Sequence, residues 1–253
     1  MTLVRVIPCL LLKGQGLVKT TRFRKPRYVG DPINAVRIFN EKEVDELVIL
    51  DITATREGRR PNFPLIEDIA SEAFMPFGYG GGIRNLDDVR TLFRLGVDKV
   101  IINSQAFENG DFINEVVSVV GGQSVVVGID IKKNFWGSYE VFTRSGEKKV
   151  DGEPESLALQ MQNRGVGELL VTSIDRDGMR SGYDTVLIER VSRGLTIPVI
   201  ACGGAGKIDD FAKAVGACAS AAAAGSMFVF HGRQQAVLIS YPEPNEMRKI
   251  FAA

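Results

Sequence analysis

Two segments of the chain match each other and differ at one chemically important position. They read VIPCLLLKGQG, which begins at Val6, and VVVGIDIKKNF, which begins at Val125. Aligned on their lysines, they place Leu11 where the second segment has Asp130. A positioned carboxyl group can act as a general acid or base, whereas leucine has no proton to exchange. The two matched positions, Leu11 and Asp130, therefore differ in whether they can take part in acid–base chemistry.

Two glycine-rich clusters indicate anion binding. Glycine allows backbone N–H groups to approach an anion closely, and the helix that follows offers unpaired donors and a partial positive charge. Ordinary turn formation is the alternative, but two clusters at matching places favour a functional role. They predict two phosphate sites on opposite sides of one mouth, and hence a ligand with an anion at each end. The residues concerned are Gly82, Asn103 and Ser104 in the first site, and Gly204, Gly225 and Ser226 in the second, with Gly178 nearby.

Alternating strand and helix patterns must position these residues. Asp31 and Pro32 have the types expected at a helix start, and a second helical pattern runs from Asn85 to Gly96. Eight runs are short, apolar on both faces and rich in Val and Ile, which is typical of parallel strands covered by helices. They are Arg5–Leu11, Leu47–Asp51, Met75–Tyr79, Val97–Asn103, Ser124–Asp130, Glu168–Ser173, Ile197–Ala201 and Ser220–Ala224.

Eight such units predict one (β/α)8 barrel domain over residues 1–253, with a doubly wound open sheet as the alternative. An internal repeat supports the barrel. ELVILD at Glu46 recurs as ELLVTS at Glu168, and GGIRNLDDV at Gly81 recurs as GGAGKIDDF at Gly203, each 122 positions later. The fixed offset predicts two four-stranded half-barrels. Barrels of this class bind ligands at the C-terminal ends of their strands, where the residues above fall.

Four charged residues stand just before apolar strand cores, in one layer at the opposite end of the predicted barrel. They are Arg5, Glu46, Lys99 and Glu168. One interpretation is a salt-bridged plug that satisfies charges at the barrel floor. The functional interpretation is a gate for a small molecule that passes along the barrel axis.

The first strand is followed by a long loop, from Lys13 to Gly30, that contains basic residues and no acid. A long loop at the mouth of a barrel is often a lid. The loop is therefore either a lid that grips an anion or a solvated surface loop, and the sequence favours neither. Its basic residues are Lys13, Lys19, Arg22, Arg24, Lys25 and Arg27.

Composition limits the remaining possibilities. Lys and Arg together number 31, as do Asp and Glu, so charge offers no argument for nucleic acid or a membrane surface. No apolar run is long enough to span a membrane, and no signal peptide is recognisable. Cys9, Cys202 and Cys218 lack a metal-binding spacing and are expected to be reduced and buried in a cytoplasmic protein. The single histidine, His231, is expected at the surface or a helix start. Neither a metal nor another cofactor is expected.

The chain resembles the cyclase subunit of imidazole glycerol phosphate synthase over essentially its whole length. The motifs DELVILDIT, GGGI, DKVIIN, TSIDRDGMRSGYD and GGAGK carry the resemblance in combination. It implies a barrel that docks a glutaminase on its N-terminal face and receives ammonia through a charged ring. That ring matches Arg5, Glu46, Lys99 and Glu168. The resemblance further implies ring closure on a nucleotide-derived ligand with two phosphates, with one acid–base carboxylate at Asp130 and the other position at Leu11.

The segments IPCLLLK, KTTRFRKPRYVGDPINAVRIFNEKEVDEL, GSMFVF and AVLISYP resemble a divergent branch of this family in surface-polysaccharide pathways. The branch implies that barrel and glutaminase supply ammonia to a separate sugar amidotransferase, which converts an acetamido to an acetamidino group. The cyclase of histidine biosynthesis is the main alternative. A sister isomerase barrel uses both half-site carboxylates, so Leu11 counts against it. A scaffold that only binds a glutaminase also remains open.

Overall fold

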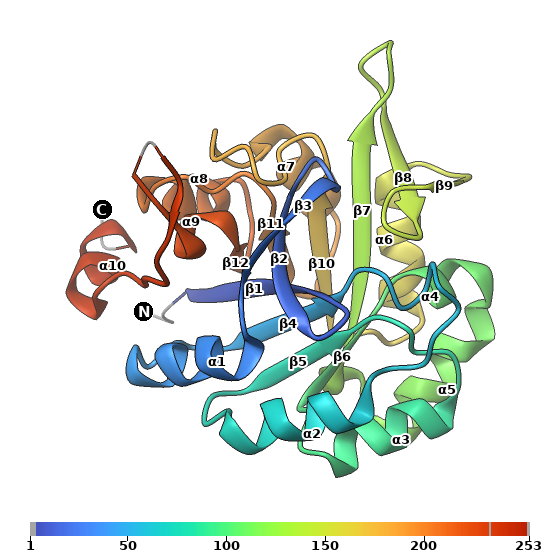
Figure 1. The fold of residues 1–253 in the computed structure, drawn as a ribbon. Coiled ribbons are helices and arrows are strands. Elements are labelled where there is room, and N and C mark those ends of the chain that lie inside the picture. The colour runs from blue at the N-terminus through green and yellow to red at the C-terminus, as the bar shows by residue number, and fades with distance from the viewer. Residues whose placement is uncertain (1–3, 233, 252–253) are drawn as a thin grey trace.

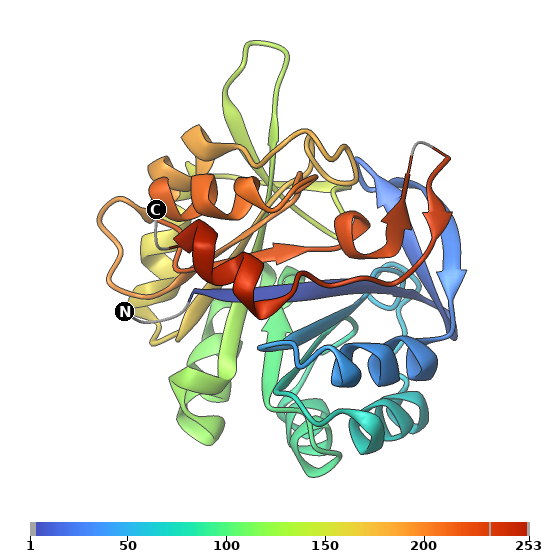
Figure 2. The ribbon, with the colours of Figure 1, turned by 90° about the vertical axis from the view of Figure 1, so that its left-hand side faces the viewer.

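Eight parallel strands form the wall of a closed barrel in the computed structural model, which describes residues 4–232 and 234–251 (Figures 1 and 2). Strand β12 pairs with β1 and β10 pairs with β7, so the sheet has no free edge within the wall. The predicted barrel is confirmed, and the open-sheet alternative is wrong. The wall strands are β1 (Arg5–Lys13), β4 (Leu47–Asp51), β5 (Phe77–Gly80), β6 (Lys99–Ile102), β7 (Val125–Lys133), β10 (Glu168–Ser173), β11 (Val199–Cys202) and β12 (Ala221–Ala224).

Helices surround the wall, and apolar side chains fill two regions (Figure 2). The larger core lies between strands and helices, and a smaller one fills the barrel interior with residues such as Ile7, Ile101 and Leu170. The helices are α1 (Pro32–Glu41), α2 (Phe63–Glu72), α3 (Leu86–Arg94), α4 (Ser104–Glu108), α5 (Gly110–Val120), α6 (Pro154–Asn163), α7 (Thr185–Ser192), α8 (Asp209–Gly216), α9 (Ser226–Val229) and α10 (Pro244–Phe251), with a short 3₁₀ turn at Gly122–Ser124.

Helix starts follow the predicted capping signals. Asp31 accepts a hydrogen bond from an amide in the first turn of α1, and Pro32 is the first residue of that helix. Asn85 caps α3 in the same way, and Gly96 follows that helix with a φ of 97°. These caps set where each helix leaves the barrel mouth.

The 122-residue repeat is visible in matched hydrogen bonds. The carboxylate of Asp88 accepts from the amide of Arg84 at 3.0 Å, and that of Asp210 accepts from the amide of Gly206 at 3.0 Å. Both aspartates are buried in the first turn of a helix that follows a glycine cluster. The same side chain therefore fixes the same turn in both halves.

The segment from Lys13 to Gly30 is not an open loop, and this part of the prediction is wrong. It folds into an antiparallel hairpin of β2 (Gly16–Thr21) and β3 (Arg24–Gly30), which continues from β1. A second hairpin of β8 (Tyr139–Thr143) and β9 (Lys148–Val150) continues from β7 in the same way. Strands β1 and β7 run past their predicted ends because each pairs with its own hairpin there. Two further short strands, β13 (Phe230–His231) and β14 (Ala236–Val237), pair after α9.

Three smaller expectations concern cysteine, histidine and membrane spans. Cys9 is buried and Cys202 partly buried, but Cys218 is exposed after α8, so its predicted burial is wrong. All three are free thiols. His231 is exposed at the end of β13, in agreement with a surface position. Over residues 4–232 and 234–251, no helix has the length and apolar character needed to cross a membrane.

The matched aspartates make a prediction about stability. Asp88→Ala and Asp210→Ala each remove a buried carboxylate and leave a partly buried amide without its acceptor, so each should lower the free energy of unfolding by about 1–3 kcal/mol. Urea denaturation followed by circular dichroism measures the loss. Asp87→Ala, which changes an exposed neighbour in α3, is the control and should have little effect. Equal stability of the Asp87 and Asp88 variants would contradict the assigned role.

Candidate functional site

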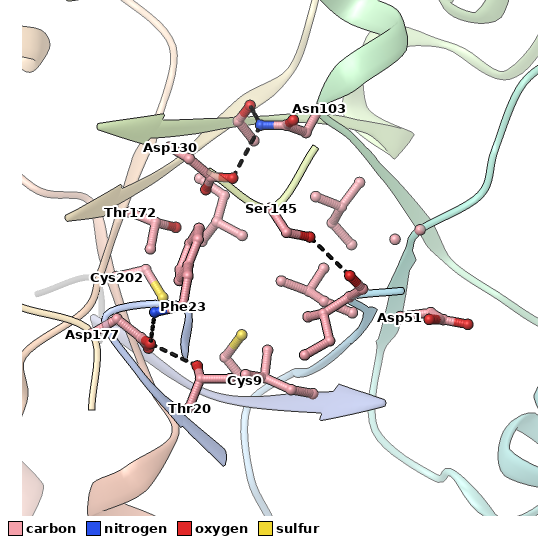
Figure 3. Close-up of a pocket in the computed structure, with 18 of the residues that line it drawn as sticks. Cys9, Thr20, Phe23, Asp51, Asn103, Asp130, Ser145, Thr172, Asp177 and Cys202 are labelled. Atoms are coloured by element: carbon pink, nitrogen blue, oxygen red, sulfur yellow. Dashed lines mark hydrogen bonds between the residues drawn. The ribbon is translucent and has the colours of Figure 1, made fainter. Parts of the chain in front are cut away.

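One pocket opens at the C-terminal ends of the wall strands and brings the predicted mouth residues together (Figure 3). Asp130 and Leu11 both line it. So do all seven predicted phosphate residues, which are Gly82, Asn103, Ser104, Gly178, Gly204, Gly225 and Ser226. The charged residues Arg5, Glu46, Lys99 and Glu168 lie at the other ends of their strands and do not line this pocket.

Asp130 projects into the pocket from β7 and is held by a neighbour from β6. The amide Nδ2 of Asn103 donates to Asp130 Oδ2 at 3.3 Å and to the carbonyl of Gly128 at 2.9 Å. Burial raises the pKa of the Asp130 carboxyl to about 7, and the nearby Asp177 carboxylate adds to this, while a hydrogen bond from Thr172 opposes it. A carboxyl group with this pKa can both accept and donate a proton near neutral pH.

Leu11 occupies the matching position in the first half and is chemically inert. It lies in β1 between Leu50 of β4 and Val18 of β2. Its side chain is only partly buried and faces the pocket. The chain is therefore apolar at this position, whereas the matching position of the second half carries a titratable acid.

Asp177 provides a second carboxyl group in the pocket, on the loop after β10. Burial raises its pKa, although hydrogen bonds from the Thr20 hydroxyl at 2.7 Å and the Phe23 amide at 3.1 Å oppose the shift. These bonds fasten the β2–β3 hairpin to the second half of the barrel (Figure 3). Its main role in this structure is thus to position the hairpin beside Asp130.

The glycine clusters have the backbone geometry that requires glycine. Gly82 has a φ of 74° and Gly204 a φ of 116°, a region that other residues rarely adopt. A Cβ added at Gly204 would lie 2.2 Å from the carbonyl of Gly182. The amide of Gly82 donates to the Thr55 hydroxyl at 3.2 Å, so a bound anion would share or replace that partner. Asn103 and Gly225 have closely similar backbone angles just before α4 and α9.

One of the six basic residues of the hairpin lies inside the pocket and not on its surface. Lys19 is buried, and its ammonium group donates to the carbonyl of Cys9. Burial lowers the pKa of Lys19. A Cβ placed on Gly225 would meet the Lys19 ammonium, so this cation adjoins the second glycine cluster. The solvated-loop interpretation is therefore wrong for Lys19. The other five basic residues, Lys13, Arg22, Arg24, Lys25 and Arg27, are exposed.

The four charged floor residues form a closed ring of alternating sign. Arg5 contacts Glu46 at 2.5 Å and Glu168 at 2.7 Å. Lys99 contacts the same two carboxylates at 3.0 and 3.1 Å. Each cation therefore bridges both acids, and the ring closes the N-terminal end of the barrel.

Several pocket residues were not predicted from sequence as site residues. Asp177 and Thr172 belong to a segment, TSIDRDGMRSGYD, whose position at a strand end could have identified them. Ser145 also lines the pocket, and its hydroxyl donates to the carbonyl of Ile52 at 2.8 Å. It arrives on the β8–β9 hairpin, which carries no strand-end signal. Phe23 reaches the pocket through the β2–β3 hairpin.

Metal ligation has little support in the described part of the chain. No group of three or more His, Cys, Asp or Glu side chains there is arranged to hold a metal ion. The acid–base and hydrogen-bonding groups of the mouth are carboxyl, amide, hydroxyl, ammonium, guanidinium and thiol groups of the chain itself.

A (β/α)8 barrel with a buried carboxyl group in its mouth, paired glycine clusters and a charged floor defines a narrow class of protein, and comparisons specify it. Residues 5–234 match the family model described as histidine biosynthesis protein. The putative imidazole glycerol phosphate synthase subunit hisF2 of Pseudomonas aeruginosa is 52% identical over 244 residues, covering 96% of this chain and 97% of the relative. The putative subunit hisF3 of Vibrio vulnificus is 47% identical over 247 residues, with 97% and 95% covered.

The name of a third relative includes neither the word putative nor a number. The imidazole glycerol phosphate synthase subunit HisF of Dictyoglomus turgidum is 43% identical over 226 residues, covering 89% of this chain and 90% of the relative. The chain belongs to the histidine biosynthesis protein family, within the group of imidazole glycerol phosphate synthase HisF subunits.

The raised pKa of Asp130 predicts a specific pH dependence. The folded state keeps a proton that the unfolded chain releases above about pH 4, so this group's contribution to stability falls as the pH rises from about 4 to about 7. Asp130→Asn removes the effect, and the variant should gain stability over the unmodified protein as the pH rises. Urea denaturation at about pH 5 and about pH 8 measures the difference. Asp68→Asn, at an exposed aspartate of α2, is the control. If the stability of Asp130→Asn depended on pH in the same way as that of the unmodified protein, the prediction would be contradicted.

Proposed function

We propose that this barrel receives ammonia from a partner glutaminase and supplies it to a separate sugar amidotransferase. The amidotransferase would convert an acetamido to an acetamidino group in lipopolysaccharide O-antigen biosynthesis, in the cytoplasm. One observation carries the proposal: four charged side chains form a complete ring at the floor, while in the mouth Leu11 stands where the repeat would place a partner carboxyl for Asp130. This arrangement supports a barrel that handles ammonia at its floor without closing a ring at its mouth.

The floor ring has the properties of a gate. Its four charges neutralise one another, which limits the penalty of partial burial. Lys99 ends on a flexible four-carbon stem, so withdrawing its ammonium group opens one side of the ring while Arg5 still bridges both acids. A glutaminase docked on the floor around Glu46, Asp98 and Lys99 would release ammonia directly against this gate.

The mouth retains the features of an anion site. Two glycine clusters and the buried Lys19 would hold a phosphorylated or nucleotide-linked small molecule. Gly82, Asn103 and Ser104 would bind one anionic end, and Gly178, Gly204, Gly225 and Ser226 the other.

The similarity pattern supports a divergent branch. Two relatives whose names carry the numbers 2 and 3 are 52% and 47% identical to this chain. Relatives named HisF without qualification range from 41% to 45% among those compared. The chain is thus more similar to additional copies of the subunit than to these unqualified ones.

Histidine-pathway cyclase activity is the second candidate, and Asp130 favours it. That residue still faces the pocket with a pKa raised to about 7, and Asn103 still orients it. An acid–base group of this kind suits the cyclase reaction. The argument against it is that Leu11 removes the second group.

Ammonia delivery predicts a defined dependence on the nitrogen source. With glutaminase and sugar amidotransferase present, glutamine should support acetamidino formation only when this chain is added, whereas an ammonium salt should support it without the chain. Asp98→Lys on the floor should lower the glutamine-dependent rate by about tenfold or more and leave the ammonium-dependent rate unchanged. Mass spectrometry of the sugar product measures both rates.

Two controls accompany that measurement. Asp98→Asn keeps a hydrogen-bond acceptor for the Phe77 amide, which Asp98 contacts at 2.8 Å, and so separates charge from local structure. Asp111→Lys reverses an exposed charge on α5. Equal glutamine-dependent rates with and without this chain would refute ammonia delivery.

The second candidate is tested at Leu11. With ammonia supplied directly, the unmodified chain should turn over the histidine-pathway cyclase substrate about 10²–10⁴-fold more slowly than a competent cyclase, because one acid–base group is missing. Leu11→Asp should recover part of that rate, and Leu11→Asn, which fills similar space without a titratable group, should not. Absorbance assays of product formation measure the rates. Turnover by the unmodified chain at ordinary enzyme rates, ~1–10³ s⁻¹, would establish the cyclase instead.

A further inference from the structure

A narrow hairpin tip projects from the mouth end of the barrel and exposes two aromatic rings. We call residues 132–140 the aromatic finger; they comprise the end of β7, the turn and the start of β8. Figure 1 shows it extending beyond every other element at the top of the molecule. Phe135 is 95% exposed and Trp136 is 86% exposed. Their rings pack edge to face with centroids 5.5 Å apart, so they form one compact apolar knob.

The tip of the finger is an ordered turn. The Asn134 side-chain oxygen accepts from the amides of Trp136 at 2.9 Å and Ser138 at 3.0 Å. The backbone of Asn134 also exchanges hydrogen bonds with Ser138 and Gly137 at 2.8 and 3.0 Å. The turn therefore fixes the direction of the knob before any partner is present, which lowers the entropy cost of binding.

The base of the finger is fastened to the loop and helix that follow β10. The Lys133 amide donates to the Asp175 carboxylate at 2.8 Å, and the Tyr139 hydroxyl donates to Asp184 at 2.9 Å. The Lys133 ammonium lies over the Tyr139 ring, 4.8 Å from its centroid. The knob is thus held in a fixed position relative to the barrel mouth.

The fold does not require two aromatic side chains to be this exposed. Phe135 and Trp136 contribute little to the core because both are almost fully solvated. Adjacent, well-ordered exposed aromatic rings are typical of binding hot spots, which insert into pockets of a partner. Phe74 is also 86% exposed, but it stands between α2 and β5 at the floor end.

The charge around the knob indicates what surrounds the receiving pocket. Lys132 is exposed and forms no ion pair within the described residues. The acid opposite it, Glu140, is engaged by Lys149 at 2.8 Å and by Asn134 at 3.1 Å. The finger therefore presents an apolar tip above one exposed lysine, Lys132, which complements an apolar pocket with an acidic group on its rim.

We propose that the aromatic finger docks the barrel mouth onto the enzyme that accepts its ammonia, by inserting Phe135 and Trp136 into an apolar, acid-rimmed pocket of that enzyme. This inference rests on the proposed function. Ammonia released into water near neutral pH becomes protonated and ceases to be a nucleophile, so the acceptor must cover the mouth. A rigid knob beside the mouth sets the orientation in which the acceptor does so.

A protein pocket fits these observations better than a lipid surface. The chain as a whole carries no net charge, so it has no general attraction to an anionic bilayer. The rings form a compact knob on a narrow support and not a broad apolar face of the kind that lies in a membrane interface. Binding to vesicles is therefore one of the outcomes that the experiment distinguishes.

The test compares the double variant Phe135→Ser/Trp136→Ser with the unmodified chain, each in complex with the glutaminase. Isothermal titration calorimetry with the sugar amidotransferase should show affinity at least ~30-fold weaker for the double variant, the loss expected for removal of one hot spot or more. Thermal stability should not change, because both side chains are exposed. Trp136→Phe, which keeps a ring, should retain most of the affinity. Val186→Ser, at an exposed apolar residue on α7, is the matched control and should bind normally.

Each outcome has one meaning. Normal amidotransferase binding by the double variant would overturn the proposed docking role of the finger and leave ammonia delivery intact. An equal loss of affinity in Val186→Ser would do the same. Failure of the unmodified chain to bind the amidotransferase, with glutamine-dependent amidation still supported, would overturn the finger alone. Failure to support glutamine-dependent amidation would overturn both proposals, since the assigned occupant would be wrong. Loss of cosedimentation with phosphatidylglycerol vesicles in the double variant, with amidotransferase affinity unchanged, would assign the finger to a membrane. Loss of self-association in analytical ultracentrifugation would assign it to a second copy.

Discussion

The lateral pairing of β12 with β1, together with that of β7 with β10, is the constraint on which the rest of the structure depends. Because all eight wall strands are parallel, closure gathers their C-terminal ends at one mouth and their N-terminal ends at one floor. Asp130, the glycine clusters and the finger therefore share one end. The charged ring, whose residues stand at the N-terminal ends of the strands, therefore lies at the floor. An open sheet with the same strands would separate Arg5 from Glu168, which now lie 2.7 Å apart.

Sequence patterns predicted the wall well for a physical reason. Strands buried on both faces are continuously apolar, and this leaves a recognisable run at each position, although β5 (FGYG) and β12 (AAAA) contain no Val, Ile or Leu. The repeat also aligned the two halves of the chain, since Asp88 and Asp210 fix equivalent turns 122 residues apart. The mouth glycines were predictable because positive φ restricts the residue type at positions such as Gly82.

The hairpins were not predictable on the same grounds. The β2–β3 segment is basic and partly exposed, so its strands lack an apolar run, and Lys19 is buried although its type suggests solvent. Ser145 acquires its place in the pocket through a contact with a distant segment, the carbonyl of Ile52. Such a residue has no local signal, because what positions it is the other half of the chain. The difference between Leu11 and Asp130 was visible in sequence because it interrupts a repeat.

The two hairpins cross between the halves in a reciprocal manner. The hairpin of the first half is bonded to Asp177 in the second, through Thr20, across 157 residues of chain. The hairpin of the second half is bonded to Ile52 in the first, through Ser145, across 93 residues. The pairing of Arg5 with Ala221, which closes the wall, spans a still longer stretch of chain. The wall and the rim of the mouth therefore both depend on contacts between the two halves, and a newly made chain can hold a ligand only after both halves have left the ribosome.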